Sequence, residues 1–313
     1  MKPYAFGVDM GGTSIKIGFF RKDGVLVEKW EIPTRTENHG ANLLTDVALA
    51  VLSKLAEKGI KTSDVEGIGM GVPGAVYNDG FVKPCANLNQ WGGFDVSSEL
   101  SALCKMQVKV LNDANAAALG EMKFGGGRGH KNVVFVTLGT GVGGGIIVDG
   151  KLVAGVHGAG GEIGHMKVKT GEVAICGCGK KGCLEQYASA TGIVRNTKLY
   201  LEQSGMESAL RQFETLSCKN IFDCAKAGDI VAVNQVDEMT HMLGKALANI
   251  ACVVDPEIFV IGGGVSRAGD IVTENVKKYF SLYAFPATED VDFVLAKLGN
   301  DAGMYGCFTK IAD

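Results

Sequence analysis

The sequence predicts an α/β protein built from two similar domains that face each other, and two observations lead to this prediction. The chain has 313 residues, about the length of two domains of roughly 150 residues each. A unit of strand, Gly-Thr turn, strand and hairpin begins near Tyr4 and appears again near Val133. Repeated units of this size indicate two domains of one architecture.

The first copy of the unit starts at the N-terminus. An apolar run is followed by the turn Asp9–Thr13, and apolar and polar residues then alternate with the period of two that is typical of a strand. Asp23-Gly24 is a hairpin signal. The strands predicted from this pattern are residues 4–8, 14–19 and 25–30.

The second copy follows a glycine-rich loop, GGGRG at residues 125–129, to which we assign no site. Residues 133–138 form an apolar strand, Gly139-Thr140-Gly141 is a turn, and the next strand ends at the hairpin signal Asp149-Gly150. The other predicted elements are strands at 65–70, 108–111 and 258–261, and helices at 42–57, 114–122, 185–203, 231–252, 270–283 and 302–311.

Composition excludes several classes of protein. Hydrophobic residues make up 46% and charged residues 21%, so the chain can bury enough apolar surface to fold. The formal net charge of −3 shows no basic excess of the kind that binds nucleic acid. We see no signal peptide and no apolar stretch near the ~20 residues of a membrane span. Nine cysteines in this length are not a disulfide framework, so we expect a cytoplasmic enzyme with reduced thiols.

The two Gly-Thr turns, Asp9–Thr13 and Gly139–Gly141, are candidate phosphate-binding segments in a chain whose 45 glycines, about 14%, are twice the usual ~7%. Such turns aim backbone N–H groups outward, and glycine lets an anion approach closely. Two of them on facing domains would clasp a polyphosphate, and Asp9 would suit a Mg²⁺ ion. The alternative is that both are plain hairpin turns in which glycine provides a positive φ.

Two further glycine segments follow strands. Gly139–Gly144 matches G-x-G-x-x-G, but residues 146–148 continue as strand where a dinucleotide site requires a helix, which argues against an NAD-dependent oxidoreductase. Gly262–Gly264 follows a strand and precedes a helix. It is either a site for adenosine or phosphate or a plain strand-to-helix turn.

Asn112-Asp113 lies between a buried strand and a helix. A carboxylate at this place could accept a proton from a substrate hydroxyl. It could equally serve as the N-cap of the helix, since Asp is a favoured cap residue. The two roles are compatible if the cap faces a cleft.

Cys176, Cys178 and Cys183 lie within CGCGKKGC, and His165 precedes them by eleven residues. Three thiolates and an imidazole make a closed tetrahedral Zn²⁺ site, which is structural because no position remains for water. A set of buried or redox-active thiols is the alternative. The remaining six cysteines are predicted to be small core residues.

Several polar loop residues suggest a polyol site. Glu162 and Glu185 flank the cysteine cluster, and Gly74 and Asn87 lie beyond the strand at 65–70. Side chains of these types pointing into one cleft would suit the paired donors and acceptors of a sugar. Individually, each is more often a solvated loop residue.

In these residues and the segments around them, the chain resembles the ROK family (repressor, open reading frame, kinase), and most closely its bacterial ATP-dependent glucokinases. The similarity spans nearly the whole chain, and the block GEIGH followed by CGCGxxGCLE is its most specific part. The matching segments are DMGGTSIK (9–16), GVPGAV (71–76), ANLNQW (86–91), LNDANAAALGE (111–121), VTLGTGVGGGI (136–146), GEIGHM (161–166), CGCGKKGCLEQYAS (176–189) and IGGGVS (261–266).

The resemblance implies a two-domain, actin-like ATPase (ribonuclease H-like) fold with the active site in the interdomain cleft. It implies phosphorylation of a hexose, D-glucose first of all, at the 6-hydroxyl, with Asp113 as the catalytic base. The implied cofactors are ATP, Mg²⁺ and a structural Zn²⁺. The implied nucleotide-binding residues are Asp9, Gly11, Gly12, Thr13, Lys16, Gly139, Thr140, Gly141, Gly263 and Gly264. The implied sugar-binding residues are Gly74, Asn87, Asn112, Asp113, Glu162, His165 and Glu185, and the zinc ligands are His165, Cys176, Cys178 and Cys183.

On this resemblance we expect a small α/β domain at 1–117 plus 299–313 and a large one at 118–298 that carries the zinc knuckle. We expect a homodimer that binds a hexose and ATP, and neither nucleic acid nor membrane. Whether Lys16 contacts phosphate or is a solvated strand residue stays open. The alternatives are a kinase for mannose, fructose, allose or an N-acetylhexosamine and, remotely, a sugar-responsive regulator, whose N-terminal helix-turn-helix has no room before Tyr4.

Overall fold

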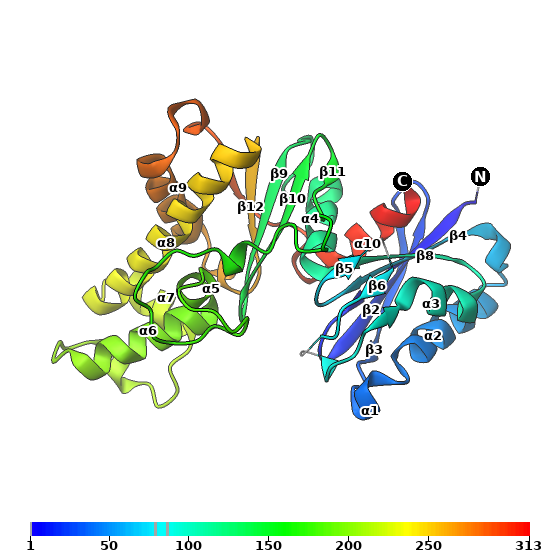
Figure 1. The fold of residues 1–313 in the computed structure, drawn as a ribbon, viewed down its shortest axis with the longest axis horizontal. Helices are drawn as coiled ribbons and strands as arrows, with labels where there is room; N and C mark the ends of the chain where they lie inside the picture. The colour runs from blue at the N-terminus through cyan, green and yellow to red at the C-terminus, as the bar shows by residue number, and fades with distance from the viewer. Residues whose placement is uncertain (1, 78–79, 86–87) are drawn as a thin grey trace.

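The computed structural model describes residues 2–77, 80–85 and 88–313. Figure 1 shows two lobes, with helices α4 (Asp113–Phe124) and α10 (Ala302–Ala312) between them. The N-terminal lobe holds the first part of the chain and the second lobe holds most of the rest. The chain returns to the N-terminal lobe in α10.

Each lobe is built on a five-stranded mixed sheet, and the two sheets have the same topology. The strand orders are β3-β2-β1-β4-β8 and β11-β10-β9-β12-β13. In both sheets the first three strands along the chain are antiparallel, and the other two run parallel to the first. This equivalence confirms the two similar α/β units predicted from the sequence. The strands are β1 (Tyr4–Met10), β2 (Ser14–Arg21), β3 (Leu26–Pro33), β4 (Val65–Val72), β8 (Gln107–Asn112), β9 (Val133–Leu138), β10 (Val142–Val148), β11 (Lys151–Leu152), β12 (Ile258–Gly262) and β13 (Asp292–Leu295).

Helices cover both faces of each sheet. Phe6 and Val8 of β1 point into the core formed with α2, whereas Ala5 of the same strand packs with α10, as the two-residue period of a strand requires. In the second lobe, Val134 of β9 faces the α8 side and Phe135 faces α4. The remaining helices are α1 (Glu37–Gly40), α2 (Leu43–Glu57), α3 (Val96–Cys104), α5 (Glu185–Ala188), α6 (Ala190–Gln203), α7 (Cys218–Lys226), α8 (Ile230–Val254) and α9 (Asp270–Tyr283).

Glycines allow α10 to pack directly against backbone. A Cβ on Gly69 of β4 would lie 1.8 Å from the carbonyl oxygen of Cys307. A Cβ on Gly306 would lie 1.6 Å from the carbonyl oxygen of Ala116 in α4. The two interlobe helices therefore cross at a distance that only glycine permits.

Some elements differ from their predictions. The helix predicted at 185–203 is broken at Ser189, which is extended (φ −95, ψ 167) and whose hydroxyl caps α6 by accepting from Gly192 N at 2.9 Å. Cys252 is exposed, contrary to the core role predicted for it. The boundary predicted between residues 117 and 118 would fall inside α4, and it stays a prediction. Helices and strands that we did not predict are α1, α3, α7, β11, β13 and a small sheet of β5 (Val76–Tyr77), β6 (Phe81–Val82) and β7 (Phe94–Asp95).

Within the described part of the chain, no helix combines the length and the apolar character that a membrane crossing needs.

Candidate active site

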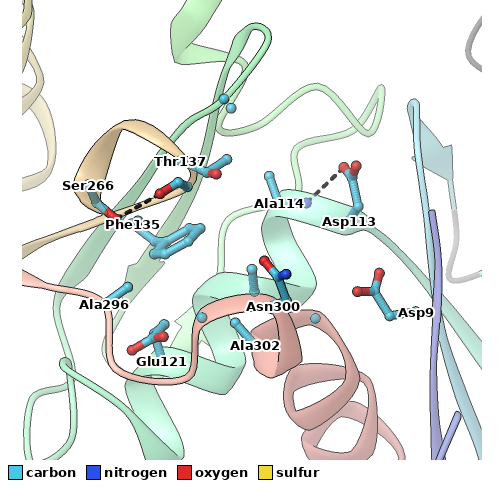
Figure 2. Close-up of a pocket in the computed structure, with 18 of the residues that line it drawn as sticks. Asp9, Asp113, Ala114, Glu121, Phe135, Thr137, Ser266, Ala296, Asn300 and Ala302 are labelled. Carbon is cyan, nitrogen blue, oxygen red and sulfur yellow. Dashed lines mark hydrogen bonds between the residues drawn. The ribbon is translucent and has the colours of Figure 1, made fainter. Parts of the chain in front are cut away.

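A cavity of about 730 Å³ lies between the lobes (Figure 2). The predicted glycine segments converge on it. Asp9, Met10 and Gly11 reach it from the end of β1, and Gly139 and Gly141 reach it from the end of β9. Gly262–Gly264 joins them from the end of β12. Ligands of α/β sheets bind at the carboxyl ends of strands, and here the equivalent ends of the two sheets meet at one cleft.

The Gly-Thr turns are closed by their own backbone. Gly11 N donates to Ser14 O, and Gly139 N donates to Gly141 O, both at 3.0 Å. None of the four glycines in these turns, Gly11, Gly12, Gly139 and Gly141, has a positive φ, so the hairpin explanation of their glycine is wrong. A Cβ added to Gly139 would meet no atom within 4 Å, so the fold itself does not require glycine there. Gly12, Thr13 and Thr140 are exposed at the turns but do not line this cavity, and Thr140 lines a neighbouring groove.

In the third glycine segment, Gly262–Gly264, the fold requires glycine at one position but not at another. Gly263 has a φ of +84°, and a Cβ on it would lie 2.5 Å from Leu138 O, so the turn itself requires this glycine. Gly264 has open space around its Cβ position. A short 3-10 helix, Val265–Ala268, separates this turn from α9.

Asn112, and not Asp113, caps helix α4. Its Oδ1 accepts from Asn115 N at 3.1 Å, and its Nδ2 donates to Gly74 O at 3.1 Å. Asp113 is therefore free of the capping role, and its carboxylate accepts a hydrogen bond from the adjacent Ala114 N at 2.8 Å (Figure 2). The Asp113 side chain faces the cavity.

The two aspartates at the cleft have raised pKa values. Desolvation inside the cleft, together with the charge of Glu162, raises the pKa of Asp113 above its ordinary value of 3.8, although Ala114 N–H acts in the opposite direction. Burial and the charge of Asp113 raise the pKa of Asp9 to about 6, against the lowering effect of Lys16. Lys16 itself donates from Nζ to Asn300 O at 2.8 Å, and its contact with phosphate stays a prediction.

A smaller cavity of about 350 Å³ adjoins the cleft. Asp113, Ala114 and Gly143 line both cavities. The smaller cavity brings together five of the seven predicted sugar-binding residues: Gly74, Asn112, Asp113, Glu162 and His165. Asn87 lies outside the described residues, and Glu185 lines the larger cleft instead.

Part of the wall of this smaller cavity is made by residues that we did not predict from the sequence. Pro73, Pro84, Gly143, Gly144 and Gly161 contribute to its wall. Pro73 lies in GVPGAV, and Gly143 and Gly144 lie in VTLGTGVGGGI, two segments that carry the family resemblance. Proline and glycine have no polar side chain, so nothing in the sequence marks these positions as part of a binding site.

Glu185 lies between the cysteine cluster and the second Gly-Thr turn. Its Oε1 accepts from Cys176 Sγ at 2.7 Å and lies 3.6 Å from His165 Nδ1. A Cβ on Gly141 would approach its Oε2 to 2.7 Å. The Glu185 carboxylate thus lies next to both the cysteine cluster and the second Gly-Thr turn.

The four predicted metal ligands form one cluster. The donor atoms of His165, Cys176, Cys178 and Cys183 all lie within 4.8 Å of one another. Cys178 Sγ is 3.6 Å from Cys183 Sγ, and Cys176 Sγ is 3.7 Å from His165 Nδ1. A tetrahedron with the usual Zn–S and Zn–N lengths has edges of about 3.8 Å and about 3.6 Å, so the donor set fits a structural zinc site.

Comparison with known proteins agrees with this geometry. The ROK family model matches residues 5–312. The glucokinase of Halalkalibacterium halodurans is 45% identical over 305 residues, which cover 96% of this chain and 92% of that protein. The N-acetyl-D-glucosamine kinase of Vibrio parahaemolyticus is 32% identical over 314 residues, or 96% of this chain and 97% of that protein.

A solved structure extends the match to three dimensions. The crystal structure of a ROK family glucokinase from Streptomyces griseus, in complex with glucose and AMPPNP, superposes with a TM-score of 0.77. It is 32% identical in sequence, and the match covers 98% of both chains.

Proposed function

The chain belongs to the ROK family, and we propose that it is an ATP-dependent glucokinase that transfers the γ-phosphoryl group of ATP to the 6-hydroxyl of D-glucose. One observation carries the proposal: Asp113 lies where a large cleft between glycine turns meets a smaller polar cavity. A phosphoryl donor and an acceptor hydroxyl would meet at this carboxylate. The glucokinases among the relatives support ATP and glucose as the pair.

The nucleotide would lie across the cleft with its phosphates at the two Gly-Thr turns. The open space at Gly139 and Gly264 supports this placement, because a ligand would account for two glycines that the fold does not require. Asp9 would hold Mg²⁺ directly or through water, and the ion would neutralise charge on the β- and γ-phosphates.

Glucose would occupy the smaller cavity. Asn112, Glu162 and His165 offer it an amide, a carboxylate and an imidazole. Asp113 would accept the proton of the 6-hydroxyl while the oxygen of that hydroxyl forms a bond to the γ-phosphorus. The bond between the γ-phosphorus and ADP, on the opposite side, would break at the same time. Backbone N–H groups of the turns would stabilise the charge on the transferred group.

The cysteine cluster would hold a structural zinc through His165, Cys176, Cys178 and Cys183. Zinc would take part in no chemical step, because four protein ligands leave it no open position. It would fix the loops that present Glu162, His165 and Glu185. The family resemblance further leads us to propose a cytoplasmic homodimer.

A kinase for another hexose is the second candidate. The N-acetyl-D-glucosamine kinase of Vibrio parahaemolyticus is nearly as similar over its full length as several glucokinases are. Discrimination among hexoses depends on the contacts of one hydroxyl or acetamido group.

The first test is an assay of ADP release, coupled to a second enzyme, over glucose, mannose, fructose, allose and N-acetylglucosamine, with the wild type and Asp113→Ala. We expect glucose to give the highest kcat/KM and the variant to lose about 10²- to 10⁴-fold in rate. The proposed reaction is wrong if no sugar stimulates ADP release, and the role of Asp113 is wrong if the variant keeps the wild-type rate. Highest activity with N-acetylglucosamine would favour the second candidate.

A further inference from the structure

Glu121, near the end of α4, is a fully buried carboxylate that the proposed chemistry does not use. Its Oε2 accepts from Gly126 N at 2.7 Å and from Lys297 N at 3.0 Å, and its Oε1 accepts from Leu298 N at 2.8 Å. Hydrogen bonds to a charged acceptor are among the strong ones in proteins. Loss of the carboxylate would leave three partly buried backbone N–H groups without this acceptor, which is costly.

The two segments that Glu121 joins are the connections between the lobes. Gly126 belongs to the stretch between α4 and β9, through which the chain enters the second lobe. Lys297 and Leu298 belong to the stretch between β13 and α10, through which it returns. One side chain therefore ties the outgoing and returning connections together, and Lys297 lies 176 residues beyond Glu121 in the sequence.

Glu121 explains why the loop GGGRG (residues 125–129) begins with glycine. A Cβ on Gly125 would lie 1.9 Å from Glu121 Oε2, so only glycine admits the carboxylate at this place. The φ of Gly125 is −115°, so backbone strain is not what requires glycine here. The loop and the buried carboxylate form one arrangement, which we call the Glu121 clamp (Glu121, Gly125, Gly126, Lys297 and Leu298).

The Glu121 clamp borders the nucleotide cleft. Ala296, Lys297 and Asn300 line the cleft, and Figure 2 shows Glu121 beside Ala296 on its floor. From the opposite lobe, Lys16 holds Asn300 O at 2.8 Å. The segment 296–300 is thus anchored at one end by the clamp and at the other by β2.

We propose that Glu121 is a positioning residue for nucleotide binding, which sets the place of the segment 296–300 in the cleft wall. The inference rests on the proposed function, because it takes ATP as the occupant of the cleft. The sugar cavity lies at the other end of α4. Eight residues separate Asp113 from Glu121, or about 12 Å along the helix. Loss of the clamp should therefore weaken the binding of nucleotide without weakening the binding of sugar.

The test compares Glu121→Gln with a matched control. The glutamine has the same size but turns one acceptor into a donor that faces backbone N–H groups. Glu257 is the control: its Oε2 accepts from Lys131 N and Asn132 N, both at 2.7 Å, but it is exposed and lines no part of the cleft. For each full-length protein, AMPPNP affinity is measured by calorimetry, KM for ATP and for glucose by coupled assay, and Tm by thermal unfolding.

We expect Glu121→Gln to raise both the Kd of AMPPNP and the KM for ATP about tenfold, with the KM for glucose unchanged. Glu257→Gln should leave all three constants unchanged, whatever it does to Tm. Gly125→Ala provides an independent variant, because it keeps the carboxylate but displaces it. It should produce the same selective loss on the nucleotide side.

Unchanged nucleotide constants in Glu121→Gln or Gly125→Ala would overturn the inference. So would an equal rise of both KM values, since that would indicate general loosening of the protein. These outcomes are distinct from a failure of the proposed function, in which the wild type itself neither binds AMPPNP nor phosphorylates a sugar.

Discussion

Asn112 and Asp113 are adjacent polar residues that perform different tasks at the start of one helix. Asn112 satisfies the helix by capping it and fixes the Gly74 carbonyl. Asp113 is thereby left with its carboxylate directed into the cleft and with a raised pKa.

The raised pKa of Asp9 predicts a substitution that stabilises the ligand-free protein. Burial raises this pKa from 3.8 to about 6, so the folded state binds more protons than the unfolded state between these values. The contribution of Asp9 to stability therefore falls as the pH rises through this window, and it is least favourable above pH 6.

Asp9→Asn removes the charge and should be more stable than the wild type by about 1–3 kcal/mol at pH 8, with no difference near pH 4. Urea unfolding of both proteins at several pH values measures this. The same variant should lose kinase activity, because Asp9 is the proposed Mg²⁺ residue. A stability difference that is independent of pH would contradict the explanation.

Among the elements, α4 and α10 have the tightest packing requirement. Gly306→Ala would gain helix propensity, but its Cβ would lie 1.6 Å from Ala116 O and 2.9 Å from Gly120 N. We expect the clash to dominate and to reduce the free energy of unfolding by more than about 2 kcal/mol. Denaturant unfolding measures the change.

Gly205→Ala is the control for this packing. Its Cβ would meet nothing within 4 Å, and its φ is not positive. Its effect should stay within about 0.5 kcal/mol. If the two alanine variants were equally stable, close helix crossing would not be the reason for glycine at position 306.

The same elements show what sequence reasoning can reach. The duplicated unit was predictable because its strands are apolar or alternate cleanly and its turns contain glycine. Strand β13 was missed because it has only four residues, with its side chains exposed or half-buried. The break at Ser189 was missed because the residues on both sides favour a helix, and only the cap geometry shows the interruption.

The candidate site was predictable where side-chain chemistry marked it. The cysteine cluster, Asp113 and the glycine turns stood out by residue type and spacing. The placement of Glu185 in the larger cleft depends on how the loop around the cysteines folds back, which spacing does not encode. Glu121 gave no signal either, because all three partners are backbone groups, and two of them, Lys297 and Leu298, are far away in the sequence.

At the scale of the whole molecule, the cysteine cluster is linked to the sugar site through shared residues. Cys178 is exposed, so Cys178→Ser removes a zinc ligand with little cost in packing. We expect zinc content, glucose affinity and Tm to fall together, because zinc would hold the loops that carry Glu162 and His165. Atomic absorption, calorimetry and thermal unfolding measure the three quantities.

Cys252→Ser is the matched control, since Cys252 is also exposed and lies outside the cluster. It should leave all three quantities as in the wild type. A Cys178→Ser protein with full zinc content and normal glucose affinity would count against the proposed structural role of the metal.

Asp113 lines both cavities, and this has a consequence for a molecule left without sugar. Among the described residues, Asp113, Ala114 and Gly143 line both cavities, so Asp113 has the only large side chain that the two cavities share. Water in the smaller cavity would then be a competing acceptor for the same phosphoryl group. We therefore expect the bound sugar to exclude water from the smaller cavity and in this way to limit hydrolysis of ATP.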